Sequence, residues 1–124
     1  MRRLFYARPN GRALAANPIP DAWSPRVDVV EEKGGYRIRL DLPGIDEKAV
    51  QVRFDDGELL VEGERAASGN GVAYVVRERP KGAFRRGFRL SEAVDADHIE
   101  ARYDRGVLEI RVPIVDRSRR IPIQ

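Results

Sequence analysis

Cysteine is absent from the 124-residue chain, and histidine occurs once, at His98. Without thiols the chain has no disulfide, no thiolate nucleophile and no cysteine-ligated zinc or iron–sulfur site. A lone histidine without cysteine or a second histidine cannot build a metal site of the usual kind, so we interpret His98 as structural or solvent-exposed. The first residues lack the apolar segment of a secretory signal, and a chain without cysteine is typical of a reducing compartment. We therefore expect a cytoplasmic location.

Long hydrophobic runs and nucleotide-binding loops are also missing. No apolar stretch approaches the roughly 20 residues of a membrane-spanning helix, so we expect no membrane span. The run SGNG, residues 68–71, lacks the Gly-Lys-Ser/Thr ending of a Walker loop and is interpreted as a flexible loop. Neighbouring acids such as Asp55 and Asp56 point to opposite faces of a strand, so they are not expected to form a catalytic carboxylate pair. No serine is expected to be an activated nucleophile, because the chain has only one histidine to serve as its base. We expect no catalytic site, no cofactor and no metal, so the protein is predicted not to be an enzyme.

Charge is distributed unevenly along the chain, which has a net charge of +3 and an isoelectric point of about 9.6. Residues 1–23 hold four arginines and one acid, residues 113–124 hold three arginines and one acid, and the body between them is slightly acidic. A nucleic-acid-binding fold usually carries its basic face on the body. We therefore expect no specific nucleic-acid partner. A basic-tailed nucleic-acid binder stays as the alternative, which a steeply salt-dependent affinity would reveal.

The body of the chain alternates apolar and charged residues with a period of two, which predicts consecutive strands. Turn residues such as Gly34-Gly35, Pro43-Gly44 and Asp56-Gly57 separate them. The length allows one domain. Several short strands with almost no helix predict an all-β, two-sheet antiparallel, immunoglobulin-like sandwich. The predicted strands lie within residues 24–32, 36–42, 50–54, 58–65, 72–79, 83–90, 99–103 and 107–112.

Short flexible extensions are expected at both ends of this sandwich. Residues 1–23 form a basic N-terminal arm, residues 24–113 the sandwich, and residues 114–124 a C-terminal extension that begins where Pro113 is expected to block pairing. The extension ends with two isoleucines around a proline, on a tail too short to fold alone. Such a pair of aliphatic side chains has no core of its own to join.

Arg86 interrupts an otherwise apolar strand face, which it shares with Phe84, Phe88 and Leu90. A guanidinium in this position lies either at a rim, with its head in water, or at depth, paired with an acid. The pattern alone leaves both arrangements open and slightly favours the rim.

Four separated motifs resemble the α-crystallin domain of small heat-shock proteins, in its bacterial and plant branch. ARYDRGVLEIRVP, residues 101–113, resembles the signature near the end of that domain. Residues 25–65, which include DLPG and GER, resemble its opening strands, and RERPKGAFRRGFRL, residues 77–90, resembles the segment that follows its dimer-forming loop. IPI, residues 121–123, resembles the C-terminal motif of the family. The likeness covers about residues 24–124 in the same order.

The resemblance implies an ATP-independent molecular chaperone, a holdase that binds partly unfolded client proteins and prevents their aggregation under stress. It also implies a homodimer formed by strand exchange, in which Arg86 meets an acid of the other subunit, here Glu78. The exchanged strand would pair with the edge of the neighbouring subunit, and an internal edge strand is the alternative. The residues so assigned to the interface, besides Arg86 and Glu78, are Val72, Tyr74, Val76, Val27 and Val29.

The terminal segments receive their roles from the same resemblance. The tail residues Ile121, Pro122 and Ile123 would dock in a groove on another subunit, and a disordered tail is the alternative. The arm is short for the family, so a dimer is expected and larger oligomers stay open. A co-chaperone of the related sandwich type is a further alternative, which should lack the dimer loop and IPI. The groove would comprise Val50, Val52, Ile99, Ala101 and Tyr103, and client binding would involve Leu4, Phe5, Tyr6 and Trp23.

Overall fold

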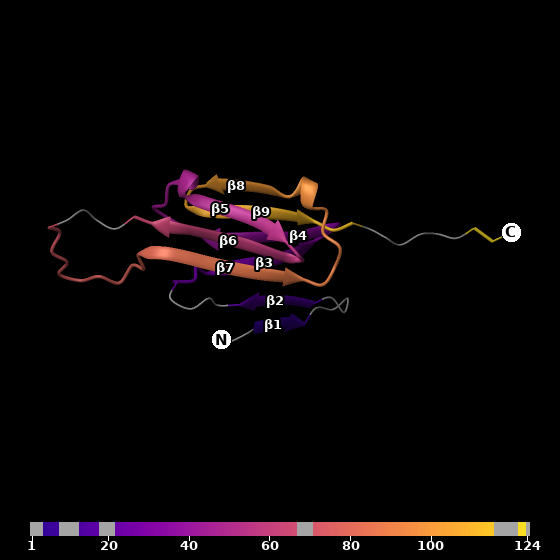
Figure 1. The fold of residues 1–124 in the computed structure, drawn as a ribbon, viewed down its shortest axis with the longest axis horizontal. Helices are drawn as coiled ribbons and strands as arrows, with labels where there is room; N and C mark the ends of the chain where they lie inside the picture. The colour runs from indigo at the N-terminus through magenta and orange to yellow at the C-terminus, as the bar shows by residue number, and fades with distance from the viewer. Residues whose placement is uncertain (1–3, 8–12, 18–21, 67–70, 116–121, 124) are drawn as a thin grey trace.

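The structure is a computed structural model that describes residues 4–7, 13–17, 22–66, 71–115 and 122–123. Nine strands and two short 3₁₀ helices occur within these residues (Figure 1). Their bounds are β1 Leu4–Ala7, β2 Ala13–Asn17, β3 Val27–Glu32, β4 Gly35–Asp41, η1 Glu47–Ala49, β5 Val50–Asp55, β6 Glu58–Arg65, β7 Gly82–Leu90, η2 Ala96–His98, β8 Glu100–Asp104 and β9 Val107–Pro113.

Two antiparallel sheets make up the sandwich. One has the strand order β1-β2-β7-β6-β5 and the other the order β3-β4-β9-β8. Every strand pair in both sheets is antiparallel. The predicted all-β, two-sheet architecture is confirmed, and the strands at the sheet edges are β1, β3, β5 and β8.

The core lies between the sheets, where the alternation of the sequence predicts it. In β4 the residues Tyr36, Ile38 and Leu40 are buried, and they pair in register with Val112, Ile110 and Leu108 of β9. Because successive side chains of a strand point to opposite faces, the arginines between them lie outside. The opposite sheet contributes Leu59, Val61, Phe84, Phe88 and Leu90.

Tight turns close the hairpins as their residues predict. Asp56 and Gly57 have φ angles of 49° and 77°, and both values lie in the left-handed region that two-residue hairpin loops require. The β8–β9 turn repeats this arrangement at Arg105 and Gly106. Asp46 caps η1, since its carboxylate accepts a hydrogen bond of 3.0 Å from the backbone N–H of Lys48.

The N-terminal arm contains strands that the sequence analysis did not expect. β1 and β2 form a hairpin that adds to β7, and the register places Leu14 opposite Leu90 and Ala16 opposite Phe88. An isolated two-stranded hairpin is marginally stable at best in water. The two strands form here because β7 offers an open edge, which the local pattern does not reveal.

Two boundaries also differ from expectation. Residues 71–81 form no strand in the single chain, although a strand was predicted over 72–79; they extend beyond the end of the sandwich (Figure 1). Pro113 does not end the pairing, because the N–H groups of Ile114 and Val115 donate to the carbonyl oxygens of Gly34 and Ala93, both at 2.8 Å. The C-terminal segment is therefore attached to the sandwich as far as Val115.

Candidate functional site

The strand β3 is an edge of the four-stranded sheet and carries two of the predicted interface residues. It pairs with β4 on one side, and no other described strand pairs with it. Val27 and Val29 point inward and are partly buried against the core. The backbone groups along the other side of β3 are therefore available to another strand.

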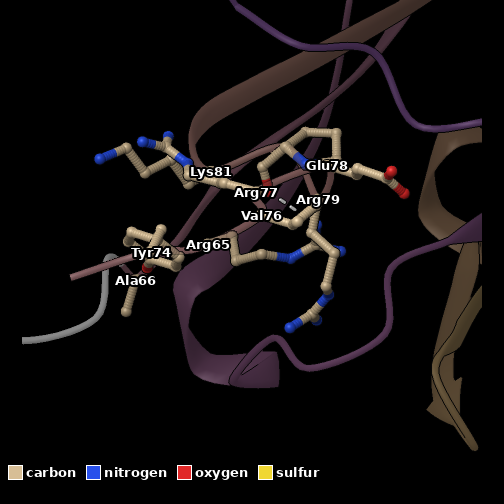
Figure 2. A pocket seen from close by; sticks show the side chains of 9 residues that line it. Arg65, Ala66, Tyr74, Val76, Arg77, Glu78, Arg79 and Lys81 are labelled. Carbon is tan, nitrogen blue, oxygen red and sulfur yellow. Dashed lines mark hydrogen bonds between the residues drawn. The ribbon is translucent and has the colours of Figure 1, made fainter. Parts of the chain in front are cut away.

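The loop between β6 and β7 presents exposed apolar side chains that have no place in the sandwich. Val72, Tyr74 and Val76 are 52%, 48% and 71% exposed, and Val75 is 99% exposed. Glu78 follows on the same segment and is exposed. Figure 2 shows Glu78 extending away from the other labelled side chains at the base of the loop. An aliphatic segment of this kind is suited to pairing with a surface outside its own chain.

Arg86 lies at the rim of the sandwich, next to the start of β3. It is partly buried on β7, and its Nη1 donates a hydrogen bond of 3.0 Å to the carbonyl oxygen of Pro25. Its guanidinium carbon is 5.8 Å from the centre of the Phe88 ring. A surface hollow adjoins it, lined by Arg26, Val27, Asp28, Arg39, Asp41, Arg86 and Val107. In the single chain Glu78 lies elsewhere, at the base of the loop.

The five predicted groove residues lie on the opposite side of the sandwich, on β5 and on or directly before β8. β5 and β8 are edge strands of different sheets and run along this same side (Figure 1). Val50, Val52, Ile99 and Tyr103 are partly buried and pack against the core, whereas Ala101 is exposed. The hydroxyl of Tyr103 donates a hydrogen bond of 2.6 Å to the carbonyl oxygen of Leu42. Phe54 of β5 is partly buried in the same way as Val50 and Val52. The sequence analysis did not include it in the groove, although its alternation with Val52 places it on the same face of the strand.

The predicted terminal residues occupy different surroundings. Ile123 is fully exposed, Pro122 is also exposed, and Ile121 lies outside the described residues. Leu4, Phe5 and Tyr6 form part of β1. Trp23 is partly buried and packs against the core: its indole N–H donates a hydrogen bond of 3.0 Å to the carbonyl oxygen of Gly82, and its ring centre is 5.2 Å from that of Phe84.

Sequence reasoning did not identify Arg65 as a residue of interest. It ends β6 and is 8% exposed, the one buried charged side chain among the described residues. Burial lowers the pKa of its guanidinium, and the positive charge of Arg79 lowers it further. The GER motif contains this residue, but a motif does not show how deep a side chain lies.

The outer face of the four-stranded sheet carries a network of exposed ion pairs. Arg37 contacts Glu32 at 2.7 Å and Glu109 at 2.8 Å, and Arg39 contacts Glu109 at 3.1 Å. The hydrogen bond from Arg39 and the charges of both arginines lower the pKa of Glu109. Such exposed pairs contribute little to stability, so this face is interpreted as a solvated surface.

The described residues contain no group of three or more potential metal ligands. None of the helices in this part of the chain has the length and hydrophobicity to cross a membrane.

Comparisons with known proteins agree with this arrangement. The model of the Hsp20/alpha crystallin family matches residues 28–124. An 18 kDa heat shock protein from Streptomyces albus G is 36% identical over 107 residues, which are 82% of this chain and 75% of the relative. Heat shock protein 16 from Schizosaccharomyces pombe is 35% identical over 109 residues, which are 82% of this chain and 74% of the relative.

Solved structures show the same fold. Heat shock protein 16.0 from Schizosaccharomyces pombe superimposes with a TM-score of 0.73 at 34% identity, over 87% of this chain and 80% of that one. A small heat-shock protein from Xylella fastidiosa, described as having a distinct high order structure, gives a TM-score of 0.70 at 38% identity, over 82% of this chain and 97% of that one.

Proposed function

Because the chain belongs to the Hsp20/alpha crystallin family, whose relatives are named small heat shock proteins, we propose that it is an ATP-independent holdase. It binds non-native client proteins under stress and keeps them from aggregating. The observation that supports this function most directly is the match of the family model to residues 28–124, which covers both sheets of the sandwich except β1, β2 and the first residue of β3. We also propose a cytoplasmic location and no enzymatic activity.

Light scattering of a heat-labile client tests the function. The purified protein, without nucleotide, should suppress the scattering at near-stoichiometric ratios. Added ATP should change nothing. Unchanged scattering at a several-fold excess of the protein would contradict the proposal, and a steep loss of activity with salt would favour a charge-driven interaction instead.

We propose that the chain forms a homodimer by strand exchange. Residues 72–76 of one copy would pair with the open side of β3 in the other. In this segment Val72, Tyr74 and Val76 would share one face of the strand. Two observations support this: β3 lacks a neighbour among the described strands, and the loop carries apolar residues outside the sandwich. Pairing between the two would give β3 a neighbouring strand and would cover the apolar residues of the loop. The high order structure named for the Xylella fastidiosa relative adds support for self-association.

Glu78 is the proposed partner of Arg86 across this interface. The hollow beside Arg86 is also lined by Arg26, Asp28, Arg39 and Asp41. The exchanged strand leads directly into Glu78, which is exposed and therefore accessible to a second copy.

The tail is proposed to dock on the groove between β5 and β8 of another copy. Ile123 is fully exposed on its own chain, and the groove is lined by half-buried apolar residues. Burial of two isoleucines contributes about 3 to 6 kcal/mol before ordering costs, so one docking event is close to millimolar. Because the chain is anchored as far as Val115, the six residues to Ile121 span at most about 20 Å. Such a contact stabilises an assembly only when several tails dock at the same time.

The proposed division of the chain follows the sequence analysis, with an arm at 1–23, an α-crystallin domain at 24–113 and a C-terminal extension at 114–124. Client contacts are proposed for Leu4, Phe5 and Tyr6 of the arm. Trp23, assigned with them, is partly buried and hydrogen-bonded to Gly82, so only part of its ring would be accessible to clients.

A further inference from the structure

The neck of the β6–β7 loop is formed by two residues. Arg65 ends β6, Gly82 begins β7, and the two pair in register. All residues between them belong to the loop that carries the proposed exchanged strand. The conformation at this neck therefore decides in which direction residues 72–76 leave the sandwich.

Arg65 connects three separate parts of the chain at the neck. Its Nη1 donates a hydrogen bond of 2.7 Å to the carbonyl oxygen of Pro80, in the returning half of the loop. Its Nη2 donates a hydrogen bond of 2.9 Å to the carbonyl oxygen of Pro43, in the turn after β4. Its guanidinium carbon is 4.6 Å from the centre of the Trp23 ring, within the range of a cation–π contact.

Trp23 holds the same neck from the other side. Its indole N–H donates to the carbonyl oxygen of Gly82 at 3.0 Å, and its backbone N–H donates to that of Ala83 at 3.2 Å. Trp23 also forms a parallel bridge with Phe84. Arg65 and Trp23 together therefore engage the carbonyl groups of Pro80, Gly82 and Ala83, at the point where the loop returns to the sheet.

The position of Arg65 is unfavourable for stability alone. A buried guanidinium is costly unless an acid compensates its charge, and no carboxylate pairs with Arg65 within the part of the chain that the structure describes. The nearby charge of Arg79 is also positive. The guanidinium supplies two hydrogen bonds in a fixed fork and a flat face for the indole, which a lysine cannot reproduce.

We propose that Arg65 and Trp23 form a latch that holds the neck of the loop and positions residues 72–76 for pairing with a second copy. This rests on the proposed strand exchange. A loop with a fixed neck loses less conformational freedom on association, so the latch strengthens the dimer without touching the partner. It also connects the end of the N-terminal arm to the neck of the dimer-forming loop, because Trp23 belongs to the arm and contacts Arg65 and Gly82 at the neck.

The test compares Arg65→Lys and Trp23→Phe with the matched control Arg85→Lys, on the outer face of the neighbouring strand. Arg65→Lys keeps the positive charge but cannot form both guanidinium hydrogen bonds, to Pro80 and Pro43. Trp23→Phe keeps an aromatic ring but loses the hydrogen bond to Gly82. Both should weaken the dimer about tenfold in sedimentation equilibrium, since rotamer-rich groups must then be ordered on binding. Arg85→Lys should leave the affinity unchanged.

Trp23 is the only tryptophan of the chain, so its fluorescence reports directly on the latch. In Arg65→Lys its emission should shift to longer wavelength and acrylamide should quench it more strongly. A residue that only stabilises the sandwich would lower the unfolding temperature while leaving the affinity of the folded chains as in wild type. A lowered unfolding temperature of Arg65→Lys together with wild-type dimer affinity would therefore overturn the proposed latch.

The chain has no cysteine, which allows the strand exchange to be tested separately. Tyr74→Cys together with Val30→Cys, at an exposed position of β3, should give a cross-link between chains under oxidising conditions. If these cysteines do not cross-link, the strand exchange fails and the latch fails with it. If they cross-link but Arg65→Lys dimerises with wild-type affinity, only the latch is overturned.

Discussion

The two open sides of the sandwich leave different groups unsatisfied. Along β3 the open feature is a backbone edge, beside charged residues that include Arg86. Along β5 and β8 it is a row of half-buried apolar side chains, such as Val52 and Ile99. A backbone edge accepts a whole strand, whereas a row of side chains accepts two or three aliphatic groups. The first is therefore suited to a lasting dimer and the second to a weak contact that gains strength by repetition.

Replacement of Arg86 should have the largest effect on this contrast. Arg86→Ala is expected to weaken the dimer by roughly 3 to 5 kcal/mol, because the carboxylate that faces it would stay buried without a partner. Sedimentation equilibrium measures the change. Glu78→Ala and the double variant complete a double-mutant cycle, in which a large coupling energy identifies the pair. Equal affinity for Arg86→Ala and wild type would assign Arg86 to the rim in the dimer as well.

Replacement of the tail isoleucines should affect only the contacts made at the groove along β5 and β8. Ile121→Ala with Ile123→Ala is expected to spare folding and the dimer, since Ile123 makes no contact in the single chain. Assemblies larger than the dimer should decrease, because two aliphatic side chains no longer contribute the roughly 3 to 6 kcal/mol of their burial. Native mass spectrometry over a concentration series measures the distribution. Identical distributions above the dimer would show a tail that does not dock.

Tyr103 connects the groove to the turn after β4, so its hydroxyl should matter for stability and not for dimerisation. Tyr103→Phe removes the hydrogen bond to the carbonyl oxygen of Leu42 and should lower the free energy of unfolding by about 1 kcal/mol. Chemical denaturation measures this change. Sedimentation of the same variant should give the wild-type affinity, and a weakened dimer would mean that the two sides of the sandwich are coupled.

The smallest effect is expected at His98, just before β8. Its Nδ1 is 2.8 Å from Asp95, and the hydrogen bond to Asp95 together with the charges of Asp95, Asp97 and Glu100 raises the pKa of the imidazole. A raised pKa in the folded state adds stability that is complete below the unfolded value of about 6.5 and is lost as the pH rises through the folded value. The exposed site makes the effect small. His98→Asn should flatten the change in thermal midpoint between pH 5.5 and 8, and an identical profile for the variant would contradict this assignment.

Local patterns predicted the interior well, because they depend on neighbouring residues alone. The alternation around Ile38 and Leu40 determines which face is buried, and Asp56-Gly57 determines a tight hairpin through its positive φ angles. The alternation of Val50 with Val52 and of Ile99 with Tyr103 likewise agrees with their packing against the core, whereas their role as a groove came from the resemblance and stays a prediction. Their motifs also placed the chain in its family, which the matching family model confirms.

Only the tertiary structure decided what depends on contacts between distant residues. The β1–β2 hairpin needs the edge of β7, and Ile114 stays attached because Gly34 accepts its hydrogen bond. The depth of Arg65 and the partial burial of Trp23 depend on three segments that meet at one neck. A period of two in the sequence specifies the face of a strand on which a side chain lies. It does not specify which strand becomes the neighbour, or how far a charge is removed from water, because both depend on how the two sheets close over each other.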